Sequence, residues 1–140
     1  MPDLQKIPGI EQLWAETQGD STICIAVLDG VVEQNHPCFA GANLTRLSTL
    51  VSGEASTDGS MSVHGTHVAS VIFGQPASPV QGIAPKCHGL IIPVFADERL
   101  KLSQLDLSRA IEQAINAGAH IINISGGQLT DFGEAEGWLE

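Results

Sequence analysis

Three short apolar segments restrict the folds that this chain can adopt. They cover residues 22–28, 89–95 and 120–125 and are rich in isoleucine, valine and leucine. A strand that is buried on both faces has this pattern, because helices cover both sides of a parallel sheet. Helical patterns over residues 64–73 and 103–117 lie between the three segments. This alternation predicts an α/β fold whose parallel strands are joined by right-handed crossovers.

Local signals indicate where the helices begin and end. Ser62 has a side chain that suits the N-cap of the helix over residues 64–73, and Gly74 is expected to end that helix. The helix over residues 103–117 is expected to end at Gly118. Its apolar face consists of Leu107, Ala110, Ile111, Ala114 and Ile115. Further expected elements are a short helix over residues 10–17, a short strand over residues 47–51 and the start of a helix at residues 133–140.

Composition restricts the size, partners and location of the protein. The chain has 140 residues, of which 43% are hydrophobic, and this suits one domain with a buried core. The net charge of −10 disfavours nucleic acid and anionic membranes as partners. The sequence contains no apolar run of transmembrane length, and residues 1–6 do not resemble a signal peptide. We therefore expect a cytoplasmic protein that binds neither nucleic acid nor a membrane.

The cysteines and histidines show no metal-binding pattern. Cys24, Cys38 and Cys87 are widely spaced and match no zinc motif. Buried reduced thiols are the prediction for these residues, and one disulfide is the alternative. His64 and His67 have the spacing of a metal pair, but no third ligand accompanies them. The sequence therefore predicts neither a metal site nor a cofactor.

Two of the apolar segments end in residues that suit a functional site. Asp29 follows the first segment, Gly126 and Gly127 follow the third, and a helix begins near His64. Ligand-binding residues gather at the carboxyl ends of parallel strands, so we expect these residues to meet at one edge of the sheet. A carboxylate bonded to Nδ1 of a histidine fixes its tautomer and stabilises the imidazolium. The expected position of His64 in the first turn of a helix also favours the neutral ring, which can act as a base towards a nucleophile.

Four sequence motifs resemble those of the subtilisin-like serine proteases. Residues 25–30 are similar to the aspartate motif of that family, and residues 64–69, His-Gly-Thr-His-Val-Ala, are similar to its histidine motif. Residues 82–85 and 121–127 resemble its next marker and its substrate-cleft strand. The triad of this family follows the chain order Asp, His, Ser. The resemblance implies a serine endopeptidase with a three-layer α/β fold of the subtilisin type.

The resemblance also implies roles for particular residues. Asp29 is expected to orient His64, His64 is expected to be the general base, and Gly65 is expected to permit close approach of the backbone. A substrate peptide would lie extended between two walls and pair with both by strand addition. The expected walls are Ser125, Gly126 and Gly127 on one side, and Phe95, Leu100, Lys101 and Leu102 on the other.

Two departures from the family pattern restrict these expectations. The Gly-Thr-Ser-Met-Ala motif of the nucleophile and the oxyanion asparagine beyond the cleft strand do not occur in the sequence. We therefore expect residues 1–140 to be the N-terminal portion, the first half, of a peptidase domain, with the C-terminal half of the same protease as its partner. Cys38 stands where many relatives have an aspartate ligand for calcium, and residues 74–79 lack the usual asparagine, so no calcium site is expected.

A narrower set of motifs resembles the proteases that process cyanobactin precursor peptides. The set includes His-Pro-Cys-Phe at residues 36–39, Gly-Ala-Asn-Leu-Thr at 41–45 and Ile-Ser-Gly-Gly-Gln at 124–128. Only 35 positions separate Asp29 from His64, which leaves no room for the helical cap of the ring-closing kind. The resemblance therefore implies an enzyme that removes the leader from a ribosomal precursor peptide. A macrocyclase-type relative and a non-catalytic peptide-binding half-domain are the alternatives.

Overall fold

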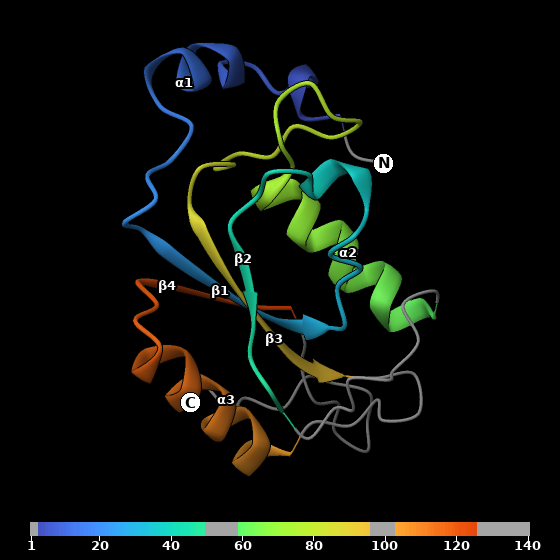
Figure 1. Ribbon diagram of the computed structural model, residues 1–140, viewed down its shortest axis with the longest axis vertical. Helices are drawn as coiled ribbons and strands as arrows, with labels where there is room; N and C mark the ends of the chain where they lie inside the picture. The colour runs from blue at the N-terminus through green and yellow to red at the C-terminus, as the bar shows by residue number, and fades with distance from the viewer. Residues whose placement is uncertain (1–2, 50–58, 96–102, 126–140) are drawn as a thin grey trace.

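Four parallel strands form the sheet at the centre of the molecule (Figure 1). The computed structural model describes residues 3–49, 59–95 and 103–125. The strands are β1 (Cys24–Gly30), β2 (Leu44–Arg46), β3 (His88–Phe95) and β4 (Ile121–Ile124). Their order is β2-β3-β1-β4, so β1 and β3 are the central strands of the described sheet. The parallel sheet expected from the apolar segments is confirmed.

One long helix covers each face of the sheet. Helix α2 (Ser60–Phe73) packs on one face and helix α3 (Gln104–Asn116) on the other, which gives the three layers seen in Figure 1. The shorter helix α1 (Ile10–Glu16) and two 3-10 turns, η1 (Leu4–Lys6) and η2 (Pro37–Phe39), lie in the connections. Within the described ranges, no helix has both the length and the apolar character needed to cross a membrane.

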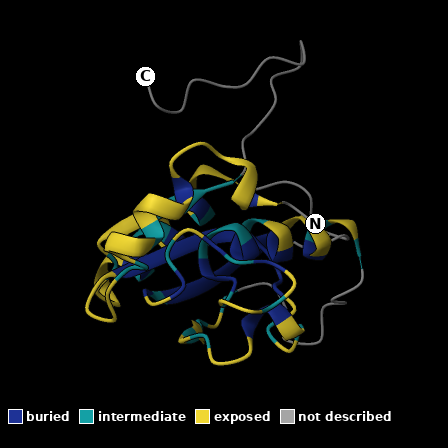
Figure 2. Cartoon of the chain, turned by 90° about the horizontal axis from the view of Figure 1, so that it is seen from above, coloured by how far each residue is buried: buried dark blue, intermediate teal, exposed yellow. Residues whose placement is uncertain are grey.

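Alternate residues of β1 point into two separate hydrophobic cores. Ala26 and Leu28 pack with α3, whereas Val27 packs with α2. Figure 2 shows the buried core of the sheet, formed by β1 and β3, beneath helix surfaces that are exposed. Phe73, at the end of α2, is completely buried beside Gly89 of β3, where a Cβ atom would lie 2.8 Å from its ring. Each long helix is therefore fixed to the sheet by its own core.

The edge strand β2 lies earlier in the chain than the sequence predicts. It pairs with β3 over Leu44–Arg46. Of the strand expected at residues 47–51, residues 47–49 are not in a strand, and residues 50–51 lie outside the described ranges. The reason is a contact with the neighbouring strand: Leu44 lies over Gly89, within the core under α2. An apolar side chain at that point fills the space that the glycine leaves.

Two details of the helices also differ from the expectations. Helix α2 begins at Ser60 with Gly59 as its N-cap, so the expected cap at Ser62 is wrong. Ile115, expected on the buried face of α3, is 60% exposed, since the sheet covers only the narrower stripe that contains Leu107 and Ala110. The expected end of α2 at Gly74 is confirmed.

All three cysteines are buried and none forms a disulfide, as predicted. Cys24 belongs to the core under α3, and Cys38 and Cys87 belong to the core under α2, so the sheet separates the first from the other two. Burial raises the pKa of the Cys24 and Cys38 thiols, because a thiolate is poorly solvated inside the protein. These thiols therefore stay protonated at neutral pH.

We expect the three thiols to react slowly in the native protein and rapidly after unfolding, since alkylation requires an exposed thiolate. The measurement is iodoacetamide labelling of the full-length protein at neutral pH, with and without denaturant. Mass spectrometry of the peptides that contain Cys24, Cys38 and Cys87 then reports the labelling at each position. Rapid labelling of any of them without denaturant would contradict its buried position.

The substitution Phe73→Ala should lower the free energy of unfolding by about 3–5 kcal/mol, because it leaves a cavity in the core under α2. Ile115→Ala is the matched control, and it should change that free energy by less than about 0.5 kcal/mol because the side chain is exposed. Urea unfolding of the full-length protein, followed by circular dichroism, measures both. Equal effects of the two substitutions would show that Phe73 is not part of the core.

Candidate active site

Asp29 lies one residue before the end of β1 and is completely buried. Its Oδ1 accepts a hydrogen bond of 2.6 Å from the backbone N–H of Gly30. The pairing of β1 with β3 shifts here, so that Asp29 lies opposite Pro93 and Gly30 lies opposite Phe95. Such a shift breaks the regular ladder and redirects the chain. The carboxylate is thus held inside the protein at the carboxyl end of the sheet, where a site was expected.

His64 is the partner of this carboxylate. Its Nδ1 lies 2.9 Å from Oδ1 of Asp29. An ionised carboxylate only accepts hydrogen bonds, so Nδ1 carries the shared hydrogen and the neutral ring has its lone pair on Nε2. The side chain of His64 is 52% exposed, whereas that of Asp29 is 0% exposed. One side of the ring is therefore fixed, and the other side is open to a reactant.

The position of His64 within its helix differs from the expected one. Because α2 begins at Ser60, His64 is the fifth residue of the helix and lies beyond its first turn. The field of a helix terminus falls off within the first turn. The expected first-turn position is therefore wrong, and the hydrogen bond to Asp29 is the interaction that sets the tautomer of the ring.

Two glycines let the backbone of α2 approach the end of β1. A Cβ atom at Gly65 would lie 2.7 Å from the carbonyl oxygen of Gly30 and 3.3 Å from Oδ1 of Asp29. A Cβ atom at Gly30 would collide with the carbonyl oxygen of Met61. The expected close approach at Gly65 is confirmed, and Gly30 makes the same approach possible from the strand.

Ser125 lies at the same edge of the sheet as the Asp29–His64 pair. It follows β4, and its N–H donates to the carbonyl oxygen of Leu28 at 3.2 Å. Its Oγ accepts a hydrogen bond of 2.7 Å from Nδ2 of Asn123. The structure thus brings together the ends of β1 and β4, as the sequence predicts.

Phe95 occupies a different environment from the one expected of a cleft wall. It is only 3% exposed and packs in the core under α3. A peptide could therefore contact the backbone of Phe95 but not its side chain. The other predicted substrate-binding residues lie outside the described ranges: Leu100, Lys101, Leu102, Gly126 and Gly127.

Two buried hydroxyl groups join α2 to the segment that follows β1, and the sequence pattern assigned them no such role. Oγ of Ser62 donates to the carbonyl oxygen of Val31. Oγ1 of Thr66 accepts a hydrogen bond of 2.9 Å from the N–H of Glu33. The only signal in the sequence is that both residues lie two positions from a histidine, and this does not reveal a contact with another element.

The model of the subtilase family matches residues 20–138 of the chain. This range includes all four strands, both long helices and the Asp29–His64 pair. The chain belongs to the subtilase family. The expected fold of the subtilisin type is confirmed by this match.

Solved structures and curated proteins related to this subtilase chain are longer than it. The prenylagaramide maturation protease PagA is 69% identical, with a TM-score of 0.77, over 95% of this chain and 45% of that chain. The PatG macrocyclase in complex with peptide is 29% identical, with a TM-score of 0.74, over 97% of this chain and 51% of that chain. The thermophilic serine proteinase of Bacillus sp. (strain AK1) is 32% identical over 80% of this chain and 28% of its own length. The subtilase chain thus spans about half the length of these solved relatives.

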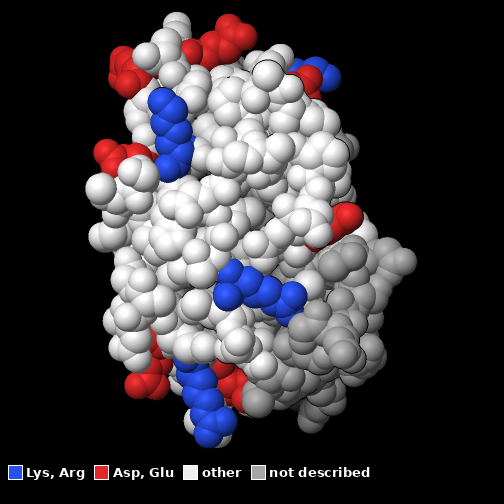
Figure 3. Space-filling view, in the orientation of Figure 1, with Lys and Arg blue, Asp and Glu red and all other residues white. Residues whose placement is uncertain are grey.

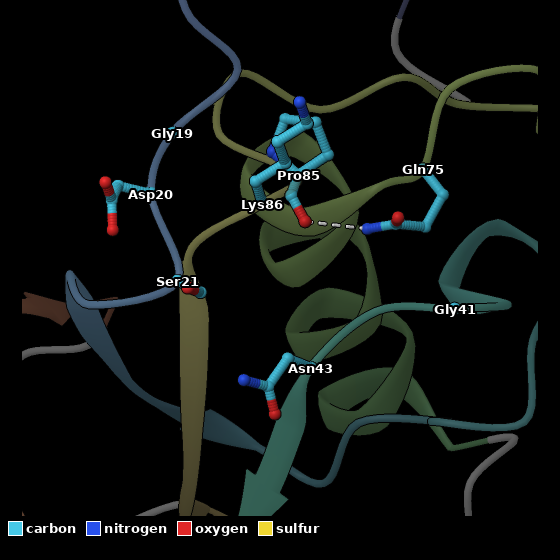
Figure 4. A pocket seen from close by; sticks show the side chains of 8 residues that line it. All are labelled: Gly19, Asp20, Ser21, Gly41, Asn43, Gln75, Pro85 and Lys86. Carbon is cyan, nitrogen blue, oxygen red and sulfur yellow. Dashed lines mark hydrogen bonds between the residues drawn. The ribbon is translucent and has the colours of Figure 1, made fainter.

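A pocket of about 400 Å³ lies at the opposite end of the subtilase sheet, where the strands begin (Figure 4). Its lining residues are Gly19, Asp20, Ser21, Gly41, Asn43, Gln75, Pro85 and Lys86. Nε2 of Gln75 donates to the carbonyl oxygen of Pro85 at 2.8 Å. Hydrogen bonds from Thr22 hold the pKa of Asp20 below its usual value. These polar groups therefore hold the surrounding loops together, away from the Asp29–His64 pair.

Charged side chains are scattered over the face of the subtilase chain that Figure 3 shows. Figure 3 shows that the Lys and Arg side chains lie apart from one another on the face in view. The sequence contains 6 Lys and Arg residues against 16 Asp and Glu residues. On the described part of that face, there is accordingly no basic patch of the kind that binds a phosphate backbone.

The substitution Gly65→Ala should lower kcat of the full-length protein about 100-fold, because the added methyl group pushes α2 away from Gly30 and separates His64 from Asp29. Val63→Ala is the control: it shortens an exposed side chain of the same helix and should change kcat less than about twofold. Steady-state cleavage of a peptide substrate measures both variants. If Gly65→Ala keeps the kcat of the unsubstituted protein, the close approach does not determine the geometry of the pair.

Proposed function

We propose that this chain forms the Asp–His part of a serine endopeptidase that removes the leader from a ribosomal precursor peptide. The observation that carries the proposal is the hydrogen bond of 2.9 Å between buried Asp29 and Nδ1 of half-exposed His64. Residues 1–140 are, in this proposal, the N-terminal portion of the peptidase domain. The C-terminal half of the same protease supplies the serine nucleophile to Nε2, the ring nitrogen that faces away from Asp29.

The pair provides proton transfer for an acyl-transfer reaction. As the serine oxygen attacks the scissile carbonyl carbon, Nε2 of His64 takes the hydroxyl proton. Asp29 stabilises the imidazolium that forms, without taking the proton itself. The imidazolium then protonates the leaving amine, the C–N bond breaks, and an acyl-enzyme remains. Water, deprotonated by the same Nε2, releases the new carboxylate and restores the serine.

The burial of Asp29 strengthens its effect on His64. Opposite charges attract more strongly where water is excluded, and the Asp29 side chain is 0% exposed. The His64 ring, at 52% exposure, remains accessible to the serine and to the substrate. The arrangement therefore combines a fixed, desolvated carboxylate with a base that can reach its reactant.

An extended peptide can bind along the edge of the sheet where the carboxyl ends of β1 and β4 lie. Ser125 follows β4 beside Leu28, one residue from Asp29, so a peptide backbone paired with Ser125 would pass close to the pair. We include Gly126, Gly127, Leu100, Lys101 and Leu102 in the binding surface because of their motif positions. The likeness to a protease named for prenylagaramide maturation, at 69% identity, supports a precursor peptide as the substrate class.

Hydrolysis, and not ring closure, is the outcome that the chain favours. Only 35 positions separate Asp29 from His64. In the described part of that connection, the elements before α2 are η2 and the three-residue strand β2. Identity is also much higher to the PagA protease, at 69%, than to the PatG macrocyclase, at 29%. A cleft without a cap admits water to the acyl-enzyme, so a linear product is expected.

Asp29→Ala and His64→Ala should each lower kcat about 10⁴- to 10⁶-fold, the range known for the triad of subtilisin itself. His67→Gln is the matched control, because His67 is an exposed histidine of the same helix and the hydrogen bond that the described structure shows between Asp29 and a histidine is to His64. The measurement is cleavage of a leader-bearing precursor peptide by the full-length protein, with products identified by mass spectrometry.

Each alternative function has its own outcome in this experiment. Unchanged cleavage in both alanine variants would contradict the proposal and would favour a peptide-binding role. An equal loss in His64→Ala and His67→Gln would favour a metal-binding histidine pair. A ring-closed product would favour the macrocyclase reading.

A further inference from the structure

Ser62 and Thr66 lie one helical turn apart on the face of α2 that meets the end of β1. Both side chains are buried, at 2% and 7% exposure. Oγ of Ser62 donates to the carbonyl oxygen of Val31, and the N–H of Glu33 donates to Oγ1 of Thr66 at 2.9 Å. The two hydrogen bonds therefore hold both ends of the short segment that continues from β1.

We infer that Ser62 and Thr66 are positioning residues, which hold His64 at its distance from Asp29 by tying α2 to the segment after β1. His64 lies between the two hydroxyl residues in the helix, and Asp29 lies two positions before Val31, where the segment that they hold begins. The inference rests on the proposed function, since it concerns the same pair.

The surroundings of the Ser62 bond make the start of the segment dependent on it. Val31 and Val32 are 2% and 3% exposed, so the backbone groups between them have little access to water. The buried carbonyl of Val31 is left unsatisfied if it loses its partner, and this is costlier than the loss of an exposed hydrogen bond. Glu33, at the other end, is an exposed residue, and its bond to Thr66 acts by holding the position of the chain. The contact between Gly65 and Gly30 lies between the two bonds and supplies no polar partner. The two glycines therefore allow α2 to approach β1, and the two hydroxyl groups fix the position of α2 along the segment after β1.

Thr66→Val is the main test, because it keeps the shape of the side chain and removes the hydroxyl. In the full-length protein, kcat for the precursor peptide should fall about 10- to 100-fold, whereas KM should change less than about threefold. Thr66→Ser, which restores the hydroxyl, should recover most of that loss. Ser62→Ala is the second variant, with the same expected split between kcat and KM.

Ser70→Ala is the matched control for a loss of stability. Ser70 is a completely buried hydroxyl residue of the same helix, but its Oγ donates to the carbonyl oxygen of His67 within α2 at 2.7 Å. This substitution should lower the melting temperature and leave kcat within about twofold, since no bond to the β1 segment is lost. An equal loss of kcat in Ser70→Ala and Thr66→Val would overturn the inference.

A double substitution separates positioning from general damage. If Thr66 acts through His64, Thr66→Val should not lower the residual rate of His64→Ala any further. A further 10- to 100-fold loss in the double variant would overturn the inference, as would wild-type kcat in both Thr66→Val and Ser62→Ala. Failure of the proposed function gives a different result, namely wild-type kcat in His64→Ala itself.

Discussion

The contact between the backbones of α2 and the end of β1 is the constraint on which the site depends. Gly30 and Gly65 meet where neither residue has room for a Cβ atom. A helix that packs on a sheet through larger side chains would stand too far away for a histidine ring to reach a carboxylate that is buried in the strand. The two glycines remove that layer of side chains, and His64 reaches Asp29 at 2.9 Å.

The hydrophobic cores hold this contact in place. Phe73 anchors the far end of α2 beside β3, about 12 Å along the helix from Gly65. Because α2 is held at both Gly65 and Phe73, it cannot tilt about either contact. The position of His64 therefore depends on the packing at both ends of α2. On the opposite face, α3 buries the other side of β1 and prevents the strand from moving away.

Sequence reasoning could predict the features that leave a local pattern. The strands β1, β3 and β4 were predictable because each leaves an apolar run, although only β1 and β3 are buried in the described structure and Ile121 of β4 is exposed. Asp29 and His64 were predictable because they stand in motifs at the ends of elements. The position of β2 was not predictable, because it depends on how Leu44 fits over Gly89 on another strand. The contacts of Ser62 were not predictable either, since a hydroxyl near a helix start equally suits a cap, and only tertiary packing chooses its partner.

The burial of the Asp29 carboxylate favours activity but lowers the stability of the fold. Its neighbours Val27 and Leu28 are apolar and completely buried, and at the next position the strand places a charged group out of contact with water. Transfer of a carboxylate from water costs free energy, and the N–H of Gly30 together with a histidine ring that is itself half in solvent returns only part of it. An apolar residue of similar size would give a more stable sheet that could not orient a base. The sequence best suited to folding and the sequence best suited to proton transfer therefore differ at this one position.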